Sequence, residues 1–407
     1  MKDNIPQVTA RSWLNVIFLM VFTALITCNM LVYAACTVTT FEVFGIGVQQ
    51  LTLLASVTSL IGVFTGIVFG RMLDVKDVKK CVTLFLAIGA AAFMIRAFIY
   101  VYAVTLALQF VGAFCVGICQ VGAPKIVSSW FPPEKVGFAT QVLLAGAGIG
   151  PVVIFAVAPK LGIKGSLIAV GIAFVCLLLF WIVACGEGPF KTDSAEKLPK
   201  EEFTKVYKSP TLWKLIITYS VSITAFTIIN TYLISAFLGK GMNELSASVM
   251  GTVLNVALLI GGYIVAAFLG AVKRYKPIVI VAEIGAIVFV LLAWFMPLGT
   301  QTWVFAILTG LFFGGSTQLQ VSRIPMIPTT GEFSPKLIST ANGFAETMKG
   351  IIAFVTPSII AYACGTNFDA IFIVFAVLCL VIIVFGGLII PELGEKAAME
   401  RKEKGVY

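Results

Sequence analysis

Three basic side chains stand inside long apolar runs of the sequence. Lys349 lies about 13 residues into its run, and Lys125 and Arg323 lie about six residues from the ends of two others. An ionised side chain near the centre of a bilayer costs roughly 2.5–3.5 kcal/mol on insertion scales, so each needs a partner or a wet cavity. Cations held in a low-dielectric space attract anions. These residue types therefore predict binding of an anion rather than covalent chemistry.

Each cation also has a structural alternative. Glu346 lies one helical turn before Lys349 and either neutralises it or releases it when a substrate or a proton arrives. Lys125 and Arg323 either bind an anion or extend toward lipid phosphates. Arg96 lies toward the end of its run, where it extends to the surface, contacts a neighbouring helix or touches substrate.

Carboxyl and neutral polar side chains complete the candidate site. Glu283 lies about six residues into the run 277–297, as a coupling residue or as the ion-pair partner of a basic residue in 273–276. Four further polar side chains at mid-run depth are either substrate contacts or interhelical hydrogen bonds. They are Asn29, Tyr33, Asn230 and Tyr232.

The sequence offers no grouping typical of catalysis or of a metal site. Histidine is absent, which removes the commonest metal ligand and the commonest proton relay near neutral pH. The nine cysteines are scattered through apolar runs and are interpreted as small packing residues. We therefore expect neither an enzyme nor a bound cofactor or metal, and any proton coupling must use carboxylates.

Composition places these residues in a membrane. The chain is 59% hydrophobic and 12% charged, with a mean hydropathy of +1.04, whereas a soluble domain is about a quarter charged. A helix needs roughly 20 apolar residues to cross a hydrocarbon core of about 30 Å, and the long unbroken runs do not fit a β-barrel. The sequence predicts an all-α integral membrane protein with twelve transmembrane helices. They lie near 13–37, 48–71, 80–102, 105–130, 137–160, 164–184, 211–238, 245–271, 277–297, 301–325, 336–362 and 369–390.

One long polar interruption divides the runs into two sets of six. We expect an N-terminal bundle in 1–185, a linker in 186–210, a C-terminal bundle in 211–392 and a charged, solvated tail in 393–407. Lysine and arginine concentrate in the connections on one side of the helices, so the positive-inside rule puts both termini in the cytoplasm of a cell-membrane protein. The net charge of +9 then reports topology and predicts no nucleic-acid partner.

The two halves resemble each other. Residues 112–126 align without gaps on 310–324, with several glycines in register and Lys125 opposite Arg323. A similar offset aligns Asn29 with Asn230. Two pseudo-symmetric bundles fit the transporter design in which one repeat rocks against the other around a midplane site.

The connection after the second run carries a family motif. Gly70, three residues and Asp74 precede the basic pair Lys79 and Lys80, and this resembles the loop motif of the major facilitator superfamily. In that family the Asp caps and pairs with neighbouring helix ends and basic residues, which holds the cytoplasmic side in one state. The resemblance implies gating roles for these four residues, although Val75 stands where the motif has a basic residue.

Further segments resemble parts of the same superfamily. Residues 129–139 are similar to its loop of aromatic, Pro, acidic, basic and Gly residues, and 146–151 to the Gly-Pro motif of its antiporters, with a packing kink as the alternative. Residues 342–350, with Lys349, resemble the lysine-bearing helix of the oxalate:formate antiporter and monocarboxylate transporter group. In that group the lysine faces an anionic substrate.

Together these features predict a secondary active transporter of a small organic anion, a carboxylate by resemblance, that works by alternating access as an antiporter or a proton symporter. Its expected partners are the anionic substrate, protons or a counter-anion, and the bilayer, and we expect a monomer. The alternative is a proton-coupled exporter of drugs or other hydrophobic compounds. That alternative needs an unpaired acidic residue in the N-terminal half, and none lies inside those runs.

Overall fold

The structure is a computed structural model of the 407-residue chain and describes residues 8–75, 77–131, 133–186, 188, 200–333 and 337–403. Every regular element in these ranges is a helix. The chain divides into two compact units. The first comprises Met1–Ile46 and Phe64–Glu196, and the second comprises Gly47–Val63 and Lys197–Tyr407.

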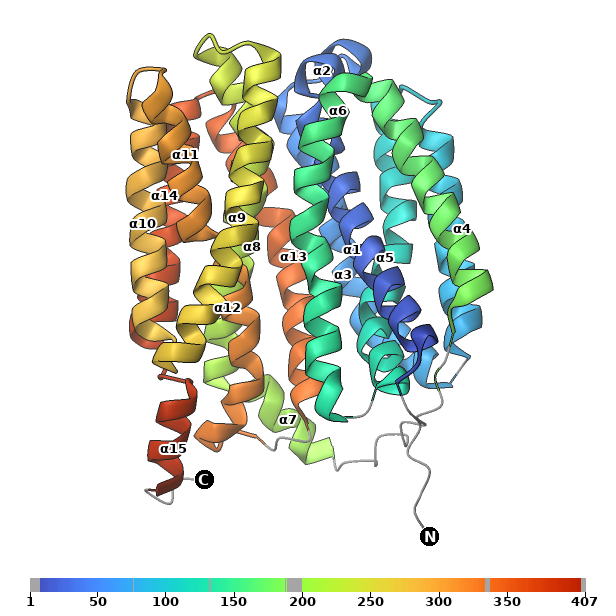
Figure 1. The fold of residues 1–407 in the computed structure, drawn as a ribbon, viewed down its shortest axis with the longest axis vertical. Coiled ribbons are helices and arrows are strands. Elements are labelled where there is room, and N and C mark those ends of the chain that lie inside the picture. Colours follow the sequence, from blue (N-terminus) through green and yellow to red (C-terminus); the bar gives the residue numbers. More distant parts are fainter. Residues whose placement is uncertain are drawn as a thin grey trace. The chain divides into compact units, whose positions relative to one another are not determined.

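The first unit is built on two pairs of long helices, α1 with α6 and α4 with α5. Its elements, blue to green in Figure 1, are α1 (Ala10–Ala35), α2 (Thr37–Phe44), the second part of α3 (Val48–Val75), α4 (Val78–Arg96), α5 (Tyr102–Trp130) and α6 (Pro133–Ala184). The two predicted runs 137–160 and 164–184 both lie in α6. A single residue, Gly162 (φ 65°, ψ 175°), breaks that helix, in a conformation that glycine adopts without a steric penalty.

Small residues bring α1 and α6 together. A Cβ added at Gly146 or Gly150 would overlap the backbone of α1 at Met20 and Ala24. Cys28 Sγ donates a hydrogen bond to the Gly150 carbonyl at 3.1 Å. Backbones that approach this closely require small side chains, as in other membrane helix pairs. The segment 146–151 therefore has a packing function in this unit.

The second unit surrounds α8, whose membrane-spanning window is the most buried among the candidate spans. Its elements are the first part of α3, α7 (Lys200–Lys208), α8 (Pro210–Gly239), α9 (Glu244–Val272), α10 (Lys276–Phe295), α11 (Thr300–Phe313), α12 (Ser316–Arg323), the 3₁₀-helix η1 (Ile324–Thr330), α13 (Ile338–Cys364), α14 (Phe368–Ile382), the π-helix η3 (Ile383–Ile389) and α15 (Glu395–Glu403). A core of aliphatic residues that includes Leu212, Ile216 and Val279 joins α8 to its neighbours.

The predicted helix 301–325 is not continuous. It ends at Phe313 and resumes at Ser316, with Gly314 and Gly315 between. A Cβ on either glycine would overlap α9, at Leu258 or Val265 respectively. The close approach to α9 thus requires both glycines, and the break places Ser316 at the start of a new helix.

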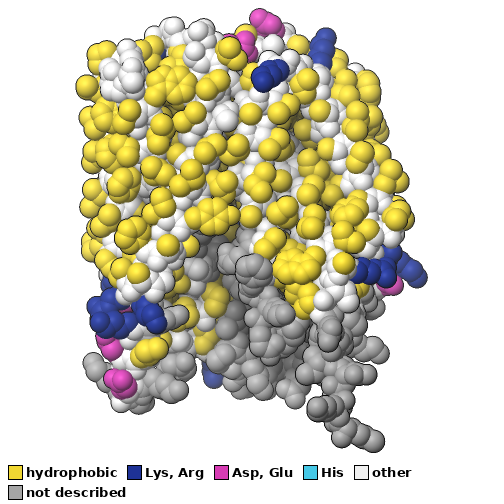
Figure 2. Space-filling model, viewed as in Figure 1, with side chains coloured by type: hydrophobic (Ala, Val, Ile, Leu, Met, Phe, Trp, Pro, Cys, Tyr) yellow, Lys and Arg dark blue, Asp and Glu magenta, His cyan; other side chains and the backbone are white. Residues whose placement is uncertain are grey.

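Nine helices of the described residues are long and apolar enough to span a membrane, or ten if the bent pair α2–α3 counts as one span. The sum starts from the nine. When α6 is counted as two spans, and the bent pair α2–α3 and the broken pair α11–α12 are each added as one, the total is twelve, the number that the sequence predicts. Large apolar side chains such as Phe98 (61%) and Phe268 (60%) are exposed. Hydrophobic side chains cover the visible flanks of the helices (Figure 2), as expected for a surface in contact with lipid. The predicted all-α membrane fold is confirmed.

Two segments differ from the prediction. The tail forms α15, in which Arg401 donates hydrogen bonds to Thr329 O (3.3 Å) and Oγ1 (3.1 Å), so it is docked on η1 and is not simply a solvated end. The predicted linker 186–210 contains a helix, α7, directly before α8. Arg401 thus anchors α15, whereas α7 contacts α13 through the rings of Tyr207 and Phe344, whose centres are 4.9 Å apart.

We expect Gly150→Ala to destabilise the first unit by about 1–3 kcal/mol, because the added methyl group overpacks the α1–α6 contact. The measurement is the thermal unfolding midpoint of the purified protein in detergent. Gly270→Ala in α9 is the control, since a Cβ there meets no atom within 4 Å. Equal midpoints for the two variants would show that the close approach is not required.

Candidate functional site

Lys349 is the twelfth of the 27 residues of α13, roughly 18 Å along the helix axis. It forms an ion pair with Glu346, three residues earlier on the same helix. Its Nζ also donates to Tyr219 Oη of α8 at 3.2 Å, and Tyr219 Oη donates to Glu346 Oε1 at 2.8 Å. Lys349 is thus not an unmatched charge, because Glu346 neutralises it and Tyr219 joins both groups.

We call Tyr219, Glu346 and Lys349 the α8–α13 triad. The ammonium lies 4.8 Å from the centre of the Tyr219 ring, a distance typical of a cation–π contact. Its side chain is only 17% exposed, whereas that of Glu346 is 45% exposed. The cation is therefore fixed inside the unit, and its partner carboxylate faces outward.

Tyr219 is not among the site residues that the sequence predicts. The residue lies in the apolar run 211–238 among other polar side chains, and its 7% exposure depends on how α8 packs against α13. Spacing along α13 is enough to pair Glu346 with Lys349. The sequence of α13 alone does not determine which residue of another helix contacts this pair, so it does not predict Tyr219 as the third member.

Arg323 ends α12 and is 1% exposed. Its Nη1 donates to the Gly386 carbonyl in η3 at 2.9 Å and to Gln320 Oε1 at 3.3 Å. The guanidinium also lies 5.0 Å from the centre of the Tyr275 ring. The alternative in which Arg323 extends toward lipid phosphates is therefore wrong, because its head group is enclosed by its own unit.

Arg323 and Lys349 have no hydrogen-bond or ion-pair partner in common within the part of the chain that the structure describes. The predicted pairing of Arg323 with Lys125 is untested, since the Lys125 side chain lies outside the described residues. The two cations of the second unit therefore belong to two separate polar clusters.

The four neutral candidates are all fully buried. Asn230 Oδ1 accepts a hydrogen bond from Asn255 Nδ2 at 2.7 Å, and its own Nδ2 donates to the Phe226 carbonyl at 2.9 Å. This geometry matches the interhelical alternative. By contrast, the side-chain polar atoms of Asn29, Tyr33 and Tyr232 have no hydrogen-bond partner among the described residues.

Glu283 is 1% exposed in α10 and accepts a hydrogen bond from Ser316 Oγ, at the start of α12. Ser316 Oγ lies 3.0 Å from Ser222 Oγ of α8. The expected ion pair with 273–276 is not found for Arg274, which pairs with Glu400 at 2.9 Å, or for Lys276, whose Nζ donates to the Leu388 carbonyl at 3.0 Å. The buried hydroxyl of Ser316, which the helix break places beside Glu283, is thus found in place of the expected basic partner.

The motif after the second run is only partly described. The side chains of Gly70 and Asp74 lie outside the described residues. The residue that caps α4 is Asp77, whose Oδ1 accepts from the backbone N–H of Lys80 at 3.0 Å. Lys79 contributes its carbonyl to the Trp181 indole N–H at 3.4 Å. The side chain that caps α4 is therefore that of Asp77, which is not one of the four predicted gating residues.

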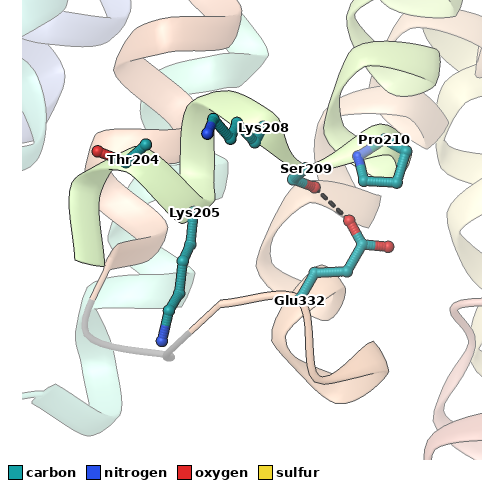
Figure 3. Close-up of a pocket in the computed structure, with 6 residues that line it drawn as sticks. All are labelled: Thr204, Lys205, Lys208, Ser209, Pro210 and Glu332. Carbon is teal, nitrogen blue, oxygen red and sulfur yellow. Dashed lines mark hydrogen bonds between the residues drawn. The ribbon is translucent and has the colours of Figure 1, made fainter. Parts of the chain in front are cut away.

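A cavity of about 340 Å³ lies where α7 meets α8. Glu332 reaches the N-terminus of α8, where it accepts a hydrogen bond from Ser209 Oγ (Figure 3). It also accepts one from the backbone N–H of Thr211 at 3.3 Å. Lys205 and Lys208 of α7 line the same cavity. None of the predicted site residues lines it, so we do not assign substrate to this cavity. Among the described residues no group of three or more acidic or cysteine side chains is placed to hold a metal ion.

Glu392 closes the polar cluster of Arg323 beyond the end of η3. Its oxygens accept from the backbone N–H groups of Tyr275 (2.7 Å), Lys276 (3.0 Å) and Gly394 (3.0 Å). Burial disfavours the charged form, but these hydrogen bonds and the charge of Arg323 outweigh burial and lower the pKa of Glu392. The carboxylate thereby caps the N-terminus of α10.

The helical membrane fold and its buried cations are those of an integral membrane protein, and the comparison of sequences identifies its family. The profile of the Major Facilitator Superfamily matches residues 17–329, so the chain belongs to this family of multi-pass membrane transporters. An uncharacterised MFS-type transporter of Mycobacterium tuberculosis is 24% identical over 255 residues, which are 61% of this chain and 57% of that protein. The match thus spans less than two thirds of the relative's length.

Solved structures share the fold at low identity. A bacterial homologue of the human lysosomal transporter Spinster has a TM-score of 0.73 and 13% identity, over 98% of this chain and 99% of that one. A D-xylose–proton symporter has a TM-score of 0.74 and 11% identity, over 94% and 98%. A nucleoside transporter has a TM-score of 0.72 and 13% identity, over 92% and 99%. At these identities the likeness concerns the fold alone.

The lowered pKa of Glu392 predicts an acid-sensitive contribution to stability. Ionised Glu392 stabilises the fold at neutral pH, and this contribution is lost as the pH falls below the unfolded value of about 4.3 toward the folded one. Glu392→Gln should lower the free energy of unfolding by about 1 kcal/mol at pH 7, with a difference that narrows below about pH 4. The measurement is the unfolding midpoint of both proteins between pH 7 and pH 3.5.

Glu400→Gln is the matched control, because the Arg274–Glu400 ion pair is exposed (side chains 43% and 49%) and such pairs contribute little. If the wild type and Glu392→Gln differ by the same amount at every pH, the stabilisation does not depend on the charge of Glu392.

Proposed function

We propose that this chain transports a small organic anion, a carboxylate, as an antiporter or a proton symporter. The α8–α13 triad is the observation that carries the proposal. A lysine this deep in an apolar helix needs a negative partner, and its partner, Glu346, is a side chain on the same helix with almost half of its surface exposed. A substrate carboxylate can take the place of that partner without leaving the cation unpaired.

The donor geometry of the triad supports exchange of one carboxylate for another. An ammonium group has three donors, and Lys349 uses one on Glu346 and one on Tyr219 Oη. Tyr219 donates its own proton to the second oxygen of Glu346. A carboxylate that replaces Glu346 would meet the same two donors, and the third N–H of Lys349 remains for another substrate oxygen.

Exchange links substrate binding to the charge of Glu346. Once displaced, the carboxylate of Glu346 no longer has Lys349 as its partner, and a proton bound there would remove the uncompensated negative charge from the transmembrane helix. Binding of an anion together with a proton leaves the net charge of the site unchanged. This is the physical basis for proton symport, and an exchange of two anions at Lys349 is the corresponding basis for antiport.

The protein is proposed to work by alternating access in the cell membrane as a monomer, with both termini cytoplasmic. The distribution of lysine and arginine among the connections supports this orientation. The carboxylate as substrate is supported by the resemblance of 342–350 to the lysine-bearing helix of carboxylate transporters, together with the ion pair found there.

Lys349→Gln should abolish uptake, because a neutral amide cannot hold a carboxylate in a low-dielectric site. The assay is uptake into proteoliposomes of radiolabelled formate, acetate, lactate, oxalate and succinate, each tested separately. Lys160→Gln is the matched control, since that lysine is exposed. Full activity of Lys349→Gln, with the protein inserted and folded, rejects the proposal.

Glu346→Gln separates the two coupling mechanisms. If Glu346 carries the proton, the variant should lose accumulation driven by an imposed pH gradient but retain exchange between labelled and unlabelled anion. The measurement is the ratio of gradient-driven uptake to exchange in the same vesicles. Gradient-driven uptake that is unchanged in Glu346→Gln shows that this carboxylate does not carry the proton.

A further inference from the structure

Arg96 is the last residue of α4 and is fully buried in the first unit. Its Nη1 donates a hydrogen bond to Gln109 Oε1 of α5. The guanidinium lies 4.8 Å from the ring centre of Phe93 and 5.7 Å from that of Tyr33 in α1. Side chains of three helices therefore enclose this cation.

No carboxylate neutralises Arg96 within the described part of the unit. Of the acidic side chains described there, Glu42 is exposed on α2, and Asp77 caps the opposite end of α4. Two ring contacts contribute about 1–2 kcal/mol each when desolvated, whereas the effective penalty for burying one ion is several kcal/mol. The hydrogen bond to Gln109 adds about 1.5–3 kcal/mol, but none of these partners carries a negative charge, so the positive charge favours an anion from outside the chain.

The polar atoms without a hydrogen-bond partner around Arg96 are mainly donors. Arg96 Nε and Nη2, Gln109 Nε2 and Tyr33 Oη are all buried, and none has a partner among the described residues. Tyr33 Oη and the Arg96 guanidinium are direct neighbours that interact through charge and a side-chain contact, although the contact does not meet the full geometric criteria for a hydrogen bond. Buried polar groups are nearly always paired, so this set of donors calls for a ligand that is mainly an acceptor.

The free edge of Arg96 fits a carboxylate. Nε–H and one N–H of Nη2 point in parallel from the same side of the guanidinium, which is a fork that binds two carboxylate oxygens at once. Asn29 lies four residues before Tyr33, on the same face of α1, and its amide N and O are both unpartnered. It offers one further donor and one acceptor, enough for a hydroxyl on the same ligand.

Other charges near this end of the unit favour an anion. Lys164 lies 4.8 Å from the centre of the Tyr100 ring. The rings of Tyr100 and Tyr33 both make edge contacts with Phe44, at 6.1 Å each. Lys164 is exposed, so its positive potential reaches the solvent, where it can raise the local concentration of anions.

We propose that Arg96, Tyr33 and Gln109 form a carboxylate-binding site inside the first unit, distinct from the α8–α13 triad. The inference rests on the proposed function only for the class of ligand. It assigns Arg96 a direct contact with the anion, and it assigns Gln109 the role of holding the guanidinium so that its fork faces the ligand.

The test measures binding by thermal shift rather than transport. Purified protein is titrated with formate, acetate, lactate and oxalate at constant ionic strength, maintained with sodium chloride so that a simple halide effect is cancelled. In a Lys349→Gln background, which removes the carboxylate site of the proposed function, Arg96→Met should lose the remaining carboxylate-dependent rise in unfolding midpoint, and Arg96→Lys, which lacks the fork, should weaken the Kd by about 10- to 100-fold. Arg274→Met is the control, because that arginine is exposed and already paired.

Gln109→Glu guards against a variant that fails to fold. It places a carboxylate beside Arg96, so in the same Lys349→Gln background the midpoint should rise in the absence of ligand and the response to added carboxylates should vanish. Gln301→Glu, at a partly exposed site in α11, is its control. A Gln109→Glu protein that responds as strongly as its control overturns the inference.

An equal carboxylate response in wild type and in Arg96→Met overturns the inference, as does a wild type that responds to none of the four probes. The proposed function is decided separately by uptake in Lys349→Gln. A response that is lost in Lys349→Gln but kept in Arg96→Met removes the Arg96 site and leaves the transport proposal in place.

Discussion

Burial of charge in an apolar protein is the constraint on which the other features depend. Each ionised side chain inside the helices must be matched by charge or by hydrogen bonds, because neither lipid nor an apolar core solvates it. Lys349 is matched by Glu346 and Tyr219. Arg323 is held by a backbone carbonyl and a glutamine, with Glu392 beyond. Among the described residues, the partners of Arg96 are Gln109 and two aromatic rings.

These three solutions differ in what they leave available. The Lys349 pair is complete, and its acidic member is 45% exposed. The cluster around Arg323 includes Glu392, which the backbone at the start of α10 holds in place, and this suits a structural anchor at a helix end. The Arg96 cluster has unpartnered donors, as does Arg323, but no carboxylate among the described residues lies beside it as Glu392 does beside Arg323.

Irregular backbone supplies partners that regular helices cannot. The break between α11 and α12 places Ser316 against Glu283, and the π-helix η3 directs the Gly386 carbonyl to Arg323. In a regular helix most main-chain groups are already bonded within the helix. Breaks and π-turns free some of them, and such features concentrate at functional sites. The second unit thus uses its irregular turns to bind one atom of each buried charged group, while Glu283 Oε2 and Arg323 Nε and Nη2 have no hydrogen-bond partner among the described residues.

Sequence alone predicted the membrane class and the all-helical fold, and it offered the pairing of Glu346 with Lys349 as one alternative. Each depends on apolar run length or on spacing within one helix. Only the tertiary structure decided that Tyr219 joins the triad, that Arg323 turns inward to η3, that Glu283 binds Ser316 and that Arg96 has no carboxylate beside it among the described residues. These facts depend on which side chains of different helices meet, and helix packing sets those contacts through small residues such as Gly150 and Gly314 that lie far apart in the chain.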